Sequence, residues 1–508
     1  MKELAAQLAR RATADPDEVA VIDAFGEHSL GEVMAAATAV AAVLEEATSG
    51  APTVLLQADN SWRTMAAAVA IGLRGGLVGV ISRHAEPAEY ALALEDIVPD
   101  AVIAAPETLT HWGVEGADLV PAGAVLEGWS LWARPGETAG VERWRGGVAI
   151  AMTSGSTGRP KCVVQSEEAI RYAGQSTIDA VGLRSGDAVA ALVPLSSVAA
   201  FCFGLYLPAM LGGPQVCLDG WKPHAALEVM ESERVAWTML VPTMALQLSL
   251  VPGADGALRA MKAMTVGGGP MNADALQRAE ETLGTTFLRV FGMSECLGHT
   301  TALPSEAALT RLGRDGRPFP GTEIRVVGED GSVLPQGSAG AAQVRGPSLF
   351  VGYARAGRPQ PAALTADGFL PTGDRAQVND DGTVTILGRE KQIIIRGGRN
   401  IDINEVEAAV AALPGIAQVC VVPVPDPLLG ERAAALVVAT VPVSLATVQE
   451  GLSAAGFPKF KWPEYVHAVP DLPQNRVGKL NRDAAVSLAE QMAKAQSADS
   501  PAGAGERR

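Results

Sequence analysis

The chain has 508 residues, of which 48% are hydrophobic and 19% are charged, a composition typical of a folded globular protein. This length exceeds what one hydrophobic core usually serves, so we expect at least two domains. The formal net charge of −16 argues against nucleic acid as the main partner, because a polyphosphate requires an excess of cationic side chains.

Cysteine usage and the N-terminal sequence indicate the cytoplasm. The five cysteines are scattered and never occur as C-x-x-C, so a small buried apolar role is expected for each, rather than a disulfide or a zinc site. They are Cys162, Cys202, Cys217, Cys296 and Cys420. The first 18 residues carry both charges and lack the apolar core of a signal peptide. The uncharged run 188–218 could span a bilayer by length, but proline and glycine interrupt it, so we interpret it as a buried strand, loop and helix and expect no membrane partner.

Through about residue 380, short apolar runs alternate with helical stretches, which is the pattern of β-α-β units. Strands are expected at 53–59, 188–195, 235–242 and 263–269, and helices at 61–76, 243–250 and 272–284. This pattern predicts an α/β fold with two mostly parallel sheets in a large N-terminal domain, residues 1–389.

After this alternating region, the sequence pattern changes. Residues 321–388 carry short strands with Gly-Asp turns and predict a small antiparallel unit. Residues 390–490 read as a small α+β C-terminal domain, with a strand at 392–398 and helices at 404–415, 445–456 and 482–495. The polar, small-residue sequence at the C-terminus predicts a disordered tail over 491–508.

The stretch "TSGSTGRPK" follows an apolar strand and suits a phosphate. Gly155 and Gly158 let backbone N–H groups turn toward an anion, and Lys161 supplies a point charge. The hydroxyl donors are those of Thr153, Ser154, Ser156 and Thr157. By itself the stretch is equally well explained as a polar surface turn.

Four further stretches favour the phosphate interpretation. "VGGGP" (266–270) offers bare backbone for a flat ring, and "FGMSE" (291–295) ends another expected strand with a hydroxyl and a carboxylate. "PTGD" supplies Asp374, and aspartate commonly binds a ribose diol. "NRVGKLNR" (475–482) supplies Lys479. Each has an ordinary structural explanation, but their joint occurrence in this order is hard to obtain by accident.

With these motifs, the chain resembles the adenylate-forming superfamily of acyl- and aryl-CoA synthetases, luciferases and peptide-synthetase adenylation domains, over about residues 20–485. The resemblance implies ATP, Mg²⁺ and coenzyme A, with Glu295 as the magnesium ligand and Lys479 contacting the carboxylate and the α-phosphate. Thr157 and Lys161 are the further catalytic residues implied. The implied ATP and AMP contacts are those of the phosphate loop together with Gly267, Gly268, Gly269, Pro270, Phe291, Gly292, Met293, Ser294, Asp374 and Arg389.

The same resemblance implies a C-terminal domain that rotates about a hinge at Lys391 between two half-reactions. The rotation would remove Lys479 and bring Arg396, Gly397 and Gly398 to a pantetheine tunnel.

The acid pocket departs from the pattern of many relatives. Ser196, Ser197, Val198 and Ala199 stand where an aromatic or histidine gate is common, and Ala341 stands where glutamate is common. The expected pocket residues are Ser196, Ser197, Ala199, Phe201, Gly268 and Gly292. The absence of an acidic residue to pair an α-ammonium makes α-amino acids poor candidates.

The leading hypothesis is an ATP-dependent ligase that joins a bulky apolar or aryl acid to coenzyme A, as a bacterial monomer or homodimer of secondary metabolism. The alternatives are an enzyme that loads a carrier protein, one that mainly forms the thioester from a preformed acyl-adenylate, and a catalytically degenerate nucleotide-binding protein. The net charge of −16 disfavours an acidic carrier protein as acceptor.

Overall fold

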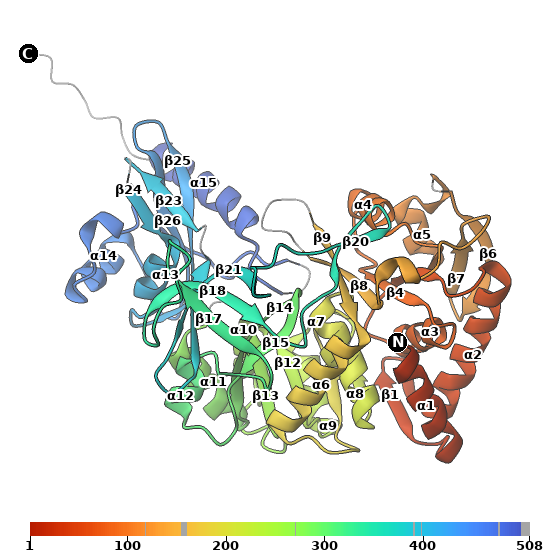
Figure 1. Ribbon diagram of the computed structural model, residues 1–508. Helices are drawn as coiled ribbons and strands as arrows, with labels where there is room; N and C mark the ends of the chain where they lie inside the picture. Colours follow the sequence, from red (N-terminus) through yellow and green to blue (C-terminus); the bar gives the residue numbers. More distant parts are fainter. Residues whose placement is uncertain are drawn as a thin grey trace, which may run out of the picture.

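The computed structural model describes residues 1–116, 118–153, 160–269, 271–389, 392–397, 399–475 and 478–498. Two nine-stranded sheets, a four-stranded sheet and a five-stranded sheet are formed by these residues (Figure 1). The two large sheets share one continuous core of buried side chains, which includes Val21 and Val216 of the first and Val54 and Val80 of the second. The α/β fold is therefore confirmed.

The first nine-stranded sheet has a parallel centre and antiparallel edges. In spatial order its strands are β16 (Arg317–Pro318), β15 (Cys296–Thr301), β14 (Phe287–Met293), β13 (Ala263–Gly267), β12 (Trp237–Leu240), β10 (Val189–Ala191), β11 (Gln215–Cys217), β1 (Val19–Asp23) and β2 (Gly26–Ser29). Because the parallel strands point the same way, the ends of β13 and β14 bring two of the predicted motifs to one edge.

The second nine-stranded sheet has parallel pairs among β3, β4, β5 and β8 and antiparallel pairs outside them. Its strands, in spatial order, are β20 (Arg358–Gln360), β19 (Gly352–Arg355), β9 (Lys161–Ser166), β8 (Gly147–Thr153), β4 (Leu77–Ile81), β3 (Thr53–Gln57), β5 (Ala101–Ala104), β7 (Trp129–Ala133) and β6 (Val120–Leu126).

The antiparallel unit expected over 321–388 is present, with one difference. Its strands are β17 (Glu323–Val327), β18 (Ala339–Arg345), β21 (Leu370–Val378) and β22 (Val384–Arg389). The hairpin of β19 and β20 leaves this unit and pairs with β9 instead, at Tyr353↔Val163. This pairing carries Tyr353 to the second large sheet.

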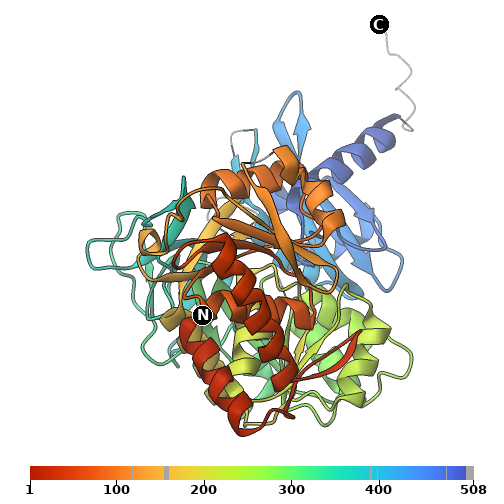
Figure 2. The same ribbon diagram turned by 90° about the vertical axis from the view of Figure 1, so that its right-hand side faces the viewer.

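The helices pack on the sheets. They are α1 (Lys2–Ala14), α2 (Leu30–Ala47), α3 (Trp62–Leu73), α4 (Pro87–Ile97), α5 (Pro106–Trp112), α6 (Glu167–Val181), α7 (Val198–Ala200), α8 (Leu207–Leu211), α9 (Pro223–Ser232), α10 (Pro242–Ser249), α11 (Ala273–Leu283), α12 (Ala308–Gly313), α13 (Ile403–Ala411), α14 (Leu445–Ala454) and α15 (Arg482–Ala498). Short 3₁₀ turns are η1 (Val114–Gly116), η2 (Glu142–Trp144) and η4 (Lys459–Lys461), and η3 (Phe201–Tyr206) is a π-helical turn. Figure 2 shows the two N-terminal helices, in red, side by side on one flank of the molecule.

The residues from Gln392 onward form a small sheet with its own core. Its strands are β23 (Ile393–Arg396), β24 (Arg399–Asp402), β25 (Ile416–Asp426), β26 (Gly430–Ala439) and β27 (Tyr465–Ala468). The strand expected over 392–398 is in fact one arm of the hairpin β23–β24. The expected boundary at 389 and the hinge at Lys391 stay predictions, because Lys391 lies outside the described residues.

The expected tail boundary at residue 491 is wrong, because α15 continues to Ala498. Its apolar face continues with it, since Ala489 and Ala493 are buried against the β25 and β26 side chains Cys420 and Leu436. That contact stabilises helix over residues whose composition suggested disorder.

The uncharged run 188–218 folds as expected into β10, α7, η3, α8 and β11. Across the described ranges, every helix is too short or too polar to cross a membrane. All five cysteines are buried thiols outside any disulfide. Burial raises the pKa of the Cys296 and Cys420 thiols to about 12.

Candidate active site

The hairpin of β8 and β9 places Lys161 at the edge of the candidate site. Thr153 pairs with Lys161 in the hairpin register, and the Thr153 hydroxyl lies 3.4 Å from the Lys161 carbonyl oxygen. The Lys161 Nζ lies 4.8 Å from the centroid of the Tyr353 ring, a cation–π contact. The predicted phosphate-loop residues Ser154, Gly155, Ser156, Thr157 and Gly158 lie outside the described residues.

Glu295 is held from two sides. The Tyr353 hydroxyl donates a 2.8 Å hydrogen bond to Glu295 Oε1, and the Phe350 N–H donates to the Glu295 carbonyl oxygen over 2.9 Å. Burial and the Glu295 charge raise the pKa of Tyr353, so the phenol stays protonated and remains a donor. The buried amide of Gln165 fixes the preceding residue, donating to the Ser294 carbonyl oxygen over 2.6 Å.

The chemistry of Glu295 fits a magnesium ion. Mg²⁺ is commonly bound by one or two carboxylates, with substrate phosphates and water completing its shell. Over the described part of the chain, no group of three or more His, Cys, Asp or Glu side chains converges on one point, so a protein-only metal cage is not formed there. One anchored carboxylate beside a lysine suits a metal that arrives with a polyphosphate.

The glycine loop after β13 meets Lys479 directly. A Cβ at Gly267 would lie 2.6 Å from the Val290 carbonyl oxygen, so no side chain fits there. Gly268 has φ +83°, and a Cβ at that position would lie 3.0 Å from Lys479 Cε. Two predicted motifs that are more than 200 residues apart in the chain, those of Gly268 and Lys479, are therefore in contact, while Pro270 lies outside the described residues.

The turn that carries Lys479 contacts helix α10 of the N-terminal region. The Thr243 hydroxyl donates to the Gly478 carbonyl oxygen over 3.0 Å, and Lys479 N donates to Asn475 Oδ1 over 2.9 Å. Desolvation, with a smaller contribution from Arg389, lowers the pKa of the Lys479 ammonium, and Glu295 partly opposes this. The Lys479 residue as a whole is exposed to solvent.

Asp374 and Arg389 form an ion pair across β21 and β22. They are register partners, and Arg389 Nε lies 2.9 Å from Asp374 Oδ1. The Asp374 residue is only 4% exposed, whereas the Arg389 side chain is half exposed. The arginine therefore orients a buried carboxylate and presents its remaining surface to the site.

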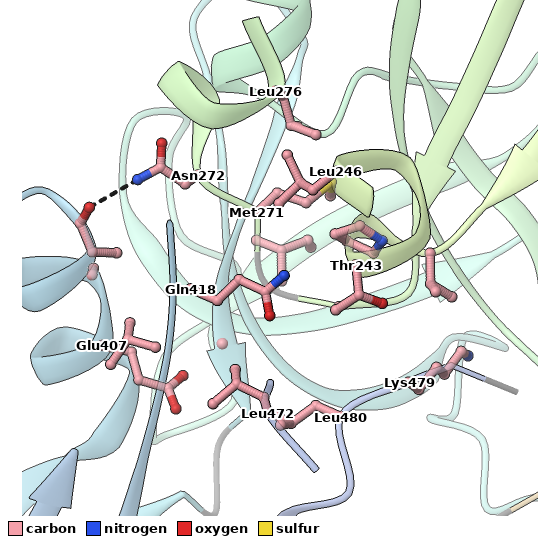
Figure 3. A pocket seen from close by; sticks show the side chains of 18 of the residues that line it. Thr243, Leu246, Met271, Asn272, Leu276, Glu407, Gln418, Leu472, Lys479 and Leu480 are labelled. Atoms are coloured by element: carbon pink, nitrogen blue, oxygen red, sulfur yellow. Dashed lines mark hydrogen bonds between the residues drawn. The ribbon is translucent and has the colours of Figure 1, made fainter. Parts of the chain in front are cut away.

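A cavity of about 270 Å³ adjoins Gly269 and Lys479, where α13 and β25 face α10 and α11. Asn272 crosses this interface and donates a 2.8 Å hydrogen bond to the Ala411 carbonyl oxygen. Figure 3 shows side chains from both sides of the interface facing one another across the space. Its lining is mostly apolar and includes Leu246, Met271, Leu276, Leu472 and Leu480. An uncharged planar group suits it better than a phosphate.

The predicted acid-pocket residues divide into two groups. Ser196 lines a second cavity of about 210 Å³, together with Pro194, Trp221 and Gly478. Ser197 instead caps α7, accepting a hydrogen bond from Ala200 N, and Phe201 is buried at the start of η3. The cavity shares Asp59, Asn60, Arg83, His84 and Asp219 with a larger polar groove of about 1,050 Å³. The cavity at Ser196 and the groove thus adjoin at these five residues.

Asn60 was not predicted from the sequence. It follows β3 of the second large sheet, and its side chain bonds the segment that leads into the predicted acid pocket. Its Nδ2 donates to the Ala191 carbonyl oxygen over 2.8 Å, and its Oδ1 accepts from Leu195 N over 2.9 Å. The feature of the sequence that could have indicated Asn60 is its position directly after the expected strand 53–59. Tyr353 and Gln165 offered no comparable signal, since their partners lie far away in the sequence.

Neither Arg396 nor Gly397, from the turn expected at a pantetheine tunnel, lines the groove or the cavity at Ser196. Arg396 bonds within the small part, to Glu464 and to the Phe460 carbonyl oxygen, and Gly397 N donates to the Leu429 carbonyl oxygen over 2.8 Å. This arrangement brings Lys479 to the glycine loop after β13. Gly398 lies outside the described residues.

Comparison with known proteins agrees with these motifs. A family model described as AMP-binding enzyme matches residues 8–354, and one described as AMP-binding enzyme C-terminal domain matches residues 405–479. A Streptomyces protein named salicylyl-CoA synthase / salicylate adenylyltransferase is 30% identical, covering 92% of this chain and 90% of its own. A 2-hydroxy-7-methoxy-5-methyl-1-naphthoate–CoA ligase of Streptomyces carzinostaticus is 29% identical, covering 97% and 94%. The crystal structure of ATP-bound MatB from Rhodopseudomonas palustris is 26% identical with a TM-score of 0.82, covering 96% and 99%.

Proposed function

The chain belongs to the family of AMP-binding enzymes and is an ATP-dependent, AMP-forming acyl-CoA synthetase, and we propose that the acid it activates is an aryl acid. The printed activities of the two Streptomyces relatives support an aryl acid. The observation that carries the assignment of the site is the contact between Lys479 and Gly268, which joins the catalytic cation to the nucleotide loop.

In the first step, a carboxylate oxygen of the acid attacks the α-phosphorus of ATP, and the bond from that phosphorus to pyrophosphate breaks. The carboxylate and the α-phosphate are both anions and must approach each other, so catalysis requires positive charge at the reacting oxygens. Lys479 supplies it on the side of Gly268, and Lys161 supplies it at the end of the β8–β9 hairpin. Asp374, oriented by Arg389, accepts hydrogen bonds from the ribose hydroxyls.

Glu295 and the ATP phosphates together would hold Mg²⁺, which neutralises charge on the phosphates. Tyr353 keeps the Glu295 carboxylate turned toward Lys161. The apolar cavity next to Gly269 suits the adenine ring, because a flat ring fits against backbone that carries no side chain.

In the second step, the thiol of coenzyme A attacks the acyl carbon and AMP leaves. The polar groove and the adjoining cavity at Ser196 support this acceptor, since Arg83 and His84 line both spaces. Arg83 carries a guanidinium that can bind an anion; it now pairs with Asp219, at 2.5 Å, and donates to His84 Nε2 over 3.0 Å. We propose that the small part, residues 390–490, rotates near Lys391 before this step and brings Arg396 and Gly397 to the acceptor.

Pyrophosphate exchange with a panel of carboxylic acids tests the first step. Thioester formation from synthetic acyl-adenylates, with coenzyme A or with a phosphopantetheinylated carrier protein, tests the second. Exchange with aryl acids and thioester formation with coenzyme A are expected. Absence of both activities would contradict the proposal.

One variant of this function is favoured by a specific observation. Ser196, Ser197 and Ala199 are small and half-buried where relatives often place a gate, which would weaken acid positioning during adenylation. Thioester formation from an acyl-adenylate without pyrophosphate exchange would establish a half-reaction enzyme.

A further inference from the structure

Asn272 joins the ends of two helices that belong to different parts of the molecule. Its Oδ1 accepts a 2.9 Å hydrogen bond from the Ala275 N–H in the first turn of α11. Its Nδ2 donates a 2.8 Å hydrogen bond to the carbonyl oxygen of Ala411, the last residue of α13, and Figure 3 shows this bond as a dashed line. The first N–H groups and the last carbonyl groups of a helix have no partner within that helix. One amide therefore satisfies an end group of each helix.

An ion pair connects α13 with the turn that carries Lys479. Glu407 lies on α13 and is 6% exposed, and its two carboxylate oxygens each lie 2.8 Å from a guanidinium nitrogen of Arg482. Arg482 begins α15 and follows Lys479 by three residues. Separating the partners of a buried ion pair is strongly destabilising. The end of α13 and the Lys479 turn therefore move together.

The same short segment of the large part contacts both of these elements. Asn272 lies four residues after Gly268, the position at which a Cβ would lie 3.0 Å from Lys479 Cε. The Thr243 hydroxyl adds a bond to the Gly478 carbonyl oxygen over 3.0 Å. A rotation of the small part that withdraws Lys479 must break the Asn272 bond as well as the Thr243 bond.

We propose that Asn272 is a positioning residue whose hydrogen bond to Ala411 holds the small part in the arrangement that brings Lys479 to the glycine loop. This inference rests on the proposed rotation of residues 390–490 between the two half-reactions. A hydrogen bond that forms in only one of two arrangements shifts the balance between them. The Asn272 amide thus favours acyl-adenylate formation over thioester formation, acting through Lys479.

Two substitutions remove the Nδ2 donor and keep the cap of α11. Asn272→Asp turns a carboxylate oxygen toward the Ala411 carbonyl oxygen, and Asn272→Ser is too short to reach it. Asp and Ser cap helices about as well as Asn, so the melting temperature should stay close to that of the wild-type enzyme. Asn379→Asp is the matched control, because the Asn379 Nδ2 donates to the Thr383 carbonyl oxygen over 3.1 Å within the turn between β21 and β22.

Double electron–electron resonance between two spin labels measures the balance of arrangements directly. Leu250→Cys, next to α10, and Lys494→Cys, on α15, carry the labels at positions that are each 80% exposed. The five native thiols are buried and stay unlabelled. In the ligand-free enzyme, both Asn272 variants should lower the ratio of this arrangement to the rotated one by roughly fivefold or more, the scale of one lost hydrogen bond. The ratio in Asn379→Asp should equal that of the wild-type enzyme.

The two half-reactions should respond in different ways. Pyrophosphate exchange with an aryl acid should fall severalfold in both Asn272 variants, because fewer molecules hold Lys479 at the glycine loop. Thioester formation from a synthetic acyl-adenylate should be kept or should increase. A general defect in folding would lower both reactions together, so the difference between them identifies a positioning role.

The outcomes separate this inference from the proposed function. If the wild-type enzyme catalyses both half-reactions but Asn272→Ser keeps the wild-type distance ratio, or if both half-reactions fall together, the role of Asn272 is overturned and the proposed function stands. A single distance in the wild-type enzyme, with and without ligands, would overturn the rotation and the role of Asn272 with it. If the wild-type enzyme catalyses neither half-reaction, the proposed function falls, and the inference falls with it.

Discussion

The Tyr353 phenol and the Glu295 carboxylate form a hydrogen bond of 2.8 Å that joins a strand of the second large sheet to the end of the first. The same aromatic ring receives the Lys161 ammonium at 4.8 Å. One tyrosine therefore positions both a cation and an anion at the edge where the phosphates are expected.

Tyr353→Phe is expected to keep the fold and the ring contact with Lys161 while releasing Glu295. A hydrogen bond to a charged group contributes about 1.5 kcal/mol or more, so kcat/KM for ATP should fall by roughly tenfold. Pyrophosphate exchange at varied ATP and Mg²⁺ concentrations measures this. Tyr172→Phe is the control, because the Tyr172 hydroxyl bonds Pro320 and Thr322 instead. Equal kinetics in the two variants would remove Tyr353 from the site.

Lys479→Ala should separate the two half-reactions. The ammonium is at the nucleotide loop in this arrangement, so its removal should lower pyrophosphate exchange by at least about a hundredfold, the scale seen when a charge-stabilising donor is lost. Thioester formation from a synthetic acyl-adenylate should remain largely intact. Lys494→Ala, on the exposed face of α15, should affect neither reaction. A comparable loss in both half-reactions would show that Lys479 is misassigned.

Gly268→Ala tests the close approach of the loop to Lys479. A Cβ there would meet Lys479 Cε at 3.0 Å, and the backbone has φ +83°. The strain should lower the free energy of unfolding by about 1 kcal/mol and the displacement of Lys479 should lower pyrophosphate exchange further. Gly253→Ala separates the two effects, since Gly253 has φ +87° with nothing within 4 Å. We expect both variants to lower the melting temperature by a similar amount, and only Gly268→Ala to lower pyrophosphate exchange. Unchanged pyrophosphate exchange in both variants would contradict this prediction.

Ser196→Phe should fill part of the cavity that adjoins the polar groove. Since Ser196 lines a space of about 210 Å³, an added phenyl ring should slow thioester formation from a synthetic acyl-adenylate more than pyrophosphate exchange. Initial rates of coenzyme A consumption give the first quantity. Ser185→Phe, on an exposed turn, serves as the control. If exchange falls while thioester formation does not, the cavity at Ser196 binds the acid and not the thiol.

The sequence predicted the elements with strong periodicity and the motifs at their ends. The alternation of apolar runs placed β3, β12 and β13 correctly, because buried parallel strands are continuous apolar stretches. Lys479 and Gly268 could be named separately, but their contact depends on how the small part docks, which no local pattern encodes.

What could not be predicted comes from pairing between distant segments. Tyr353 is at the site only because β19 pairs with β9 rather than with the neighbouring antiparallel unit. His299 is a fully buried residue of β15, and only the structure shows that its ring nitrogens have no hydrogen-bond partner among the described residues. The π-helical turn η3 is likewise invisible to a 3.6-residue period.

The burial of all five cysteines has a consequence for the handling of a reactive intermediate. A mixed anhydride of an acid and AMP acylates any thiolate it meets, and an accessible cysteine would consume it. All five cysteine thiols are buried in the core, so the thiol of coenzyme A is the accessible thiol that the acyl group meets. Colorimetric thiol reagents can therefore follow coenzyme A consumption continuously, with the folded enzyme contributing no background signal.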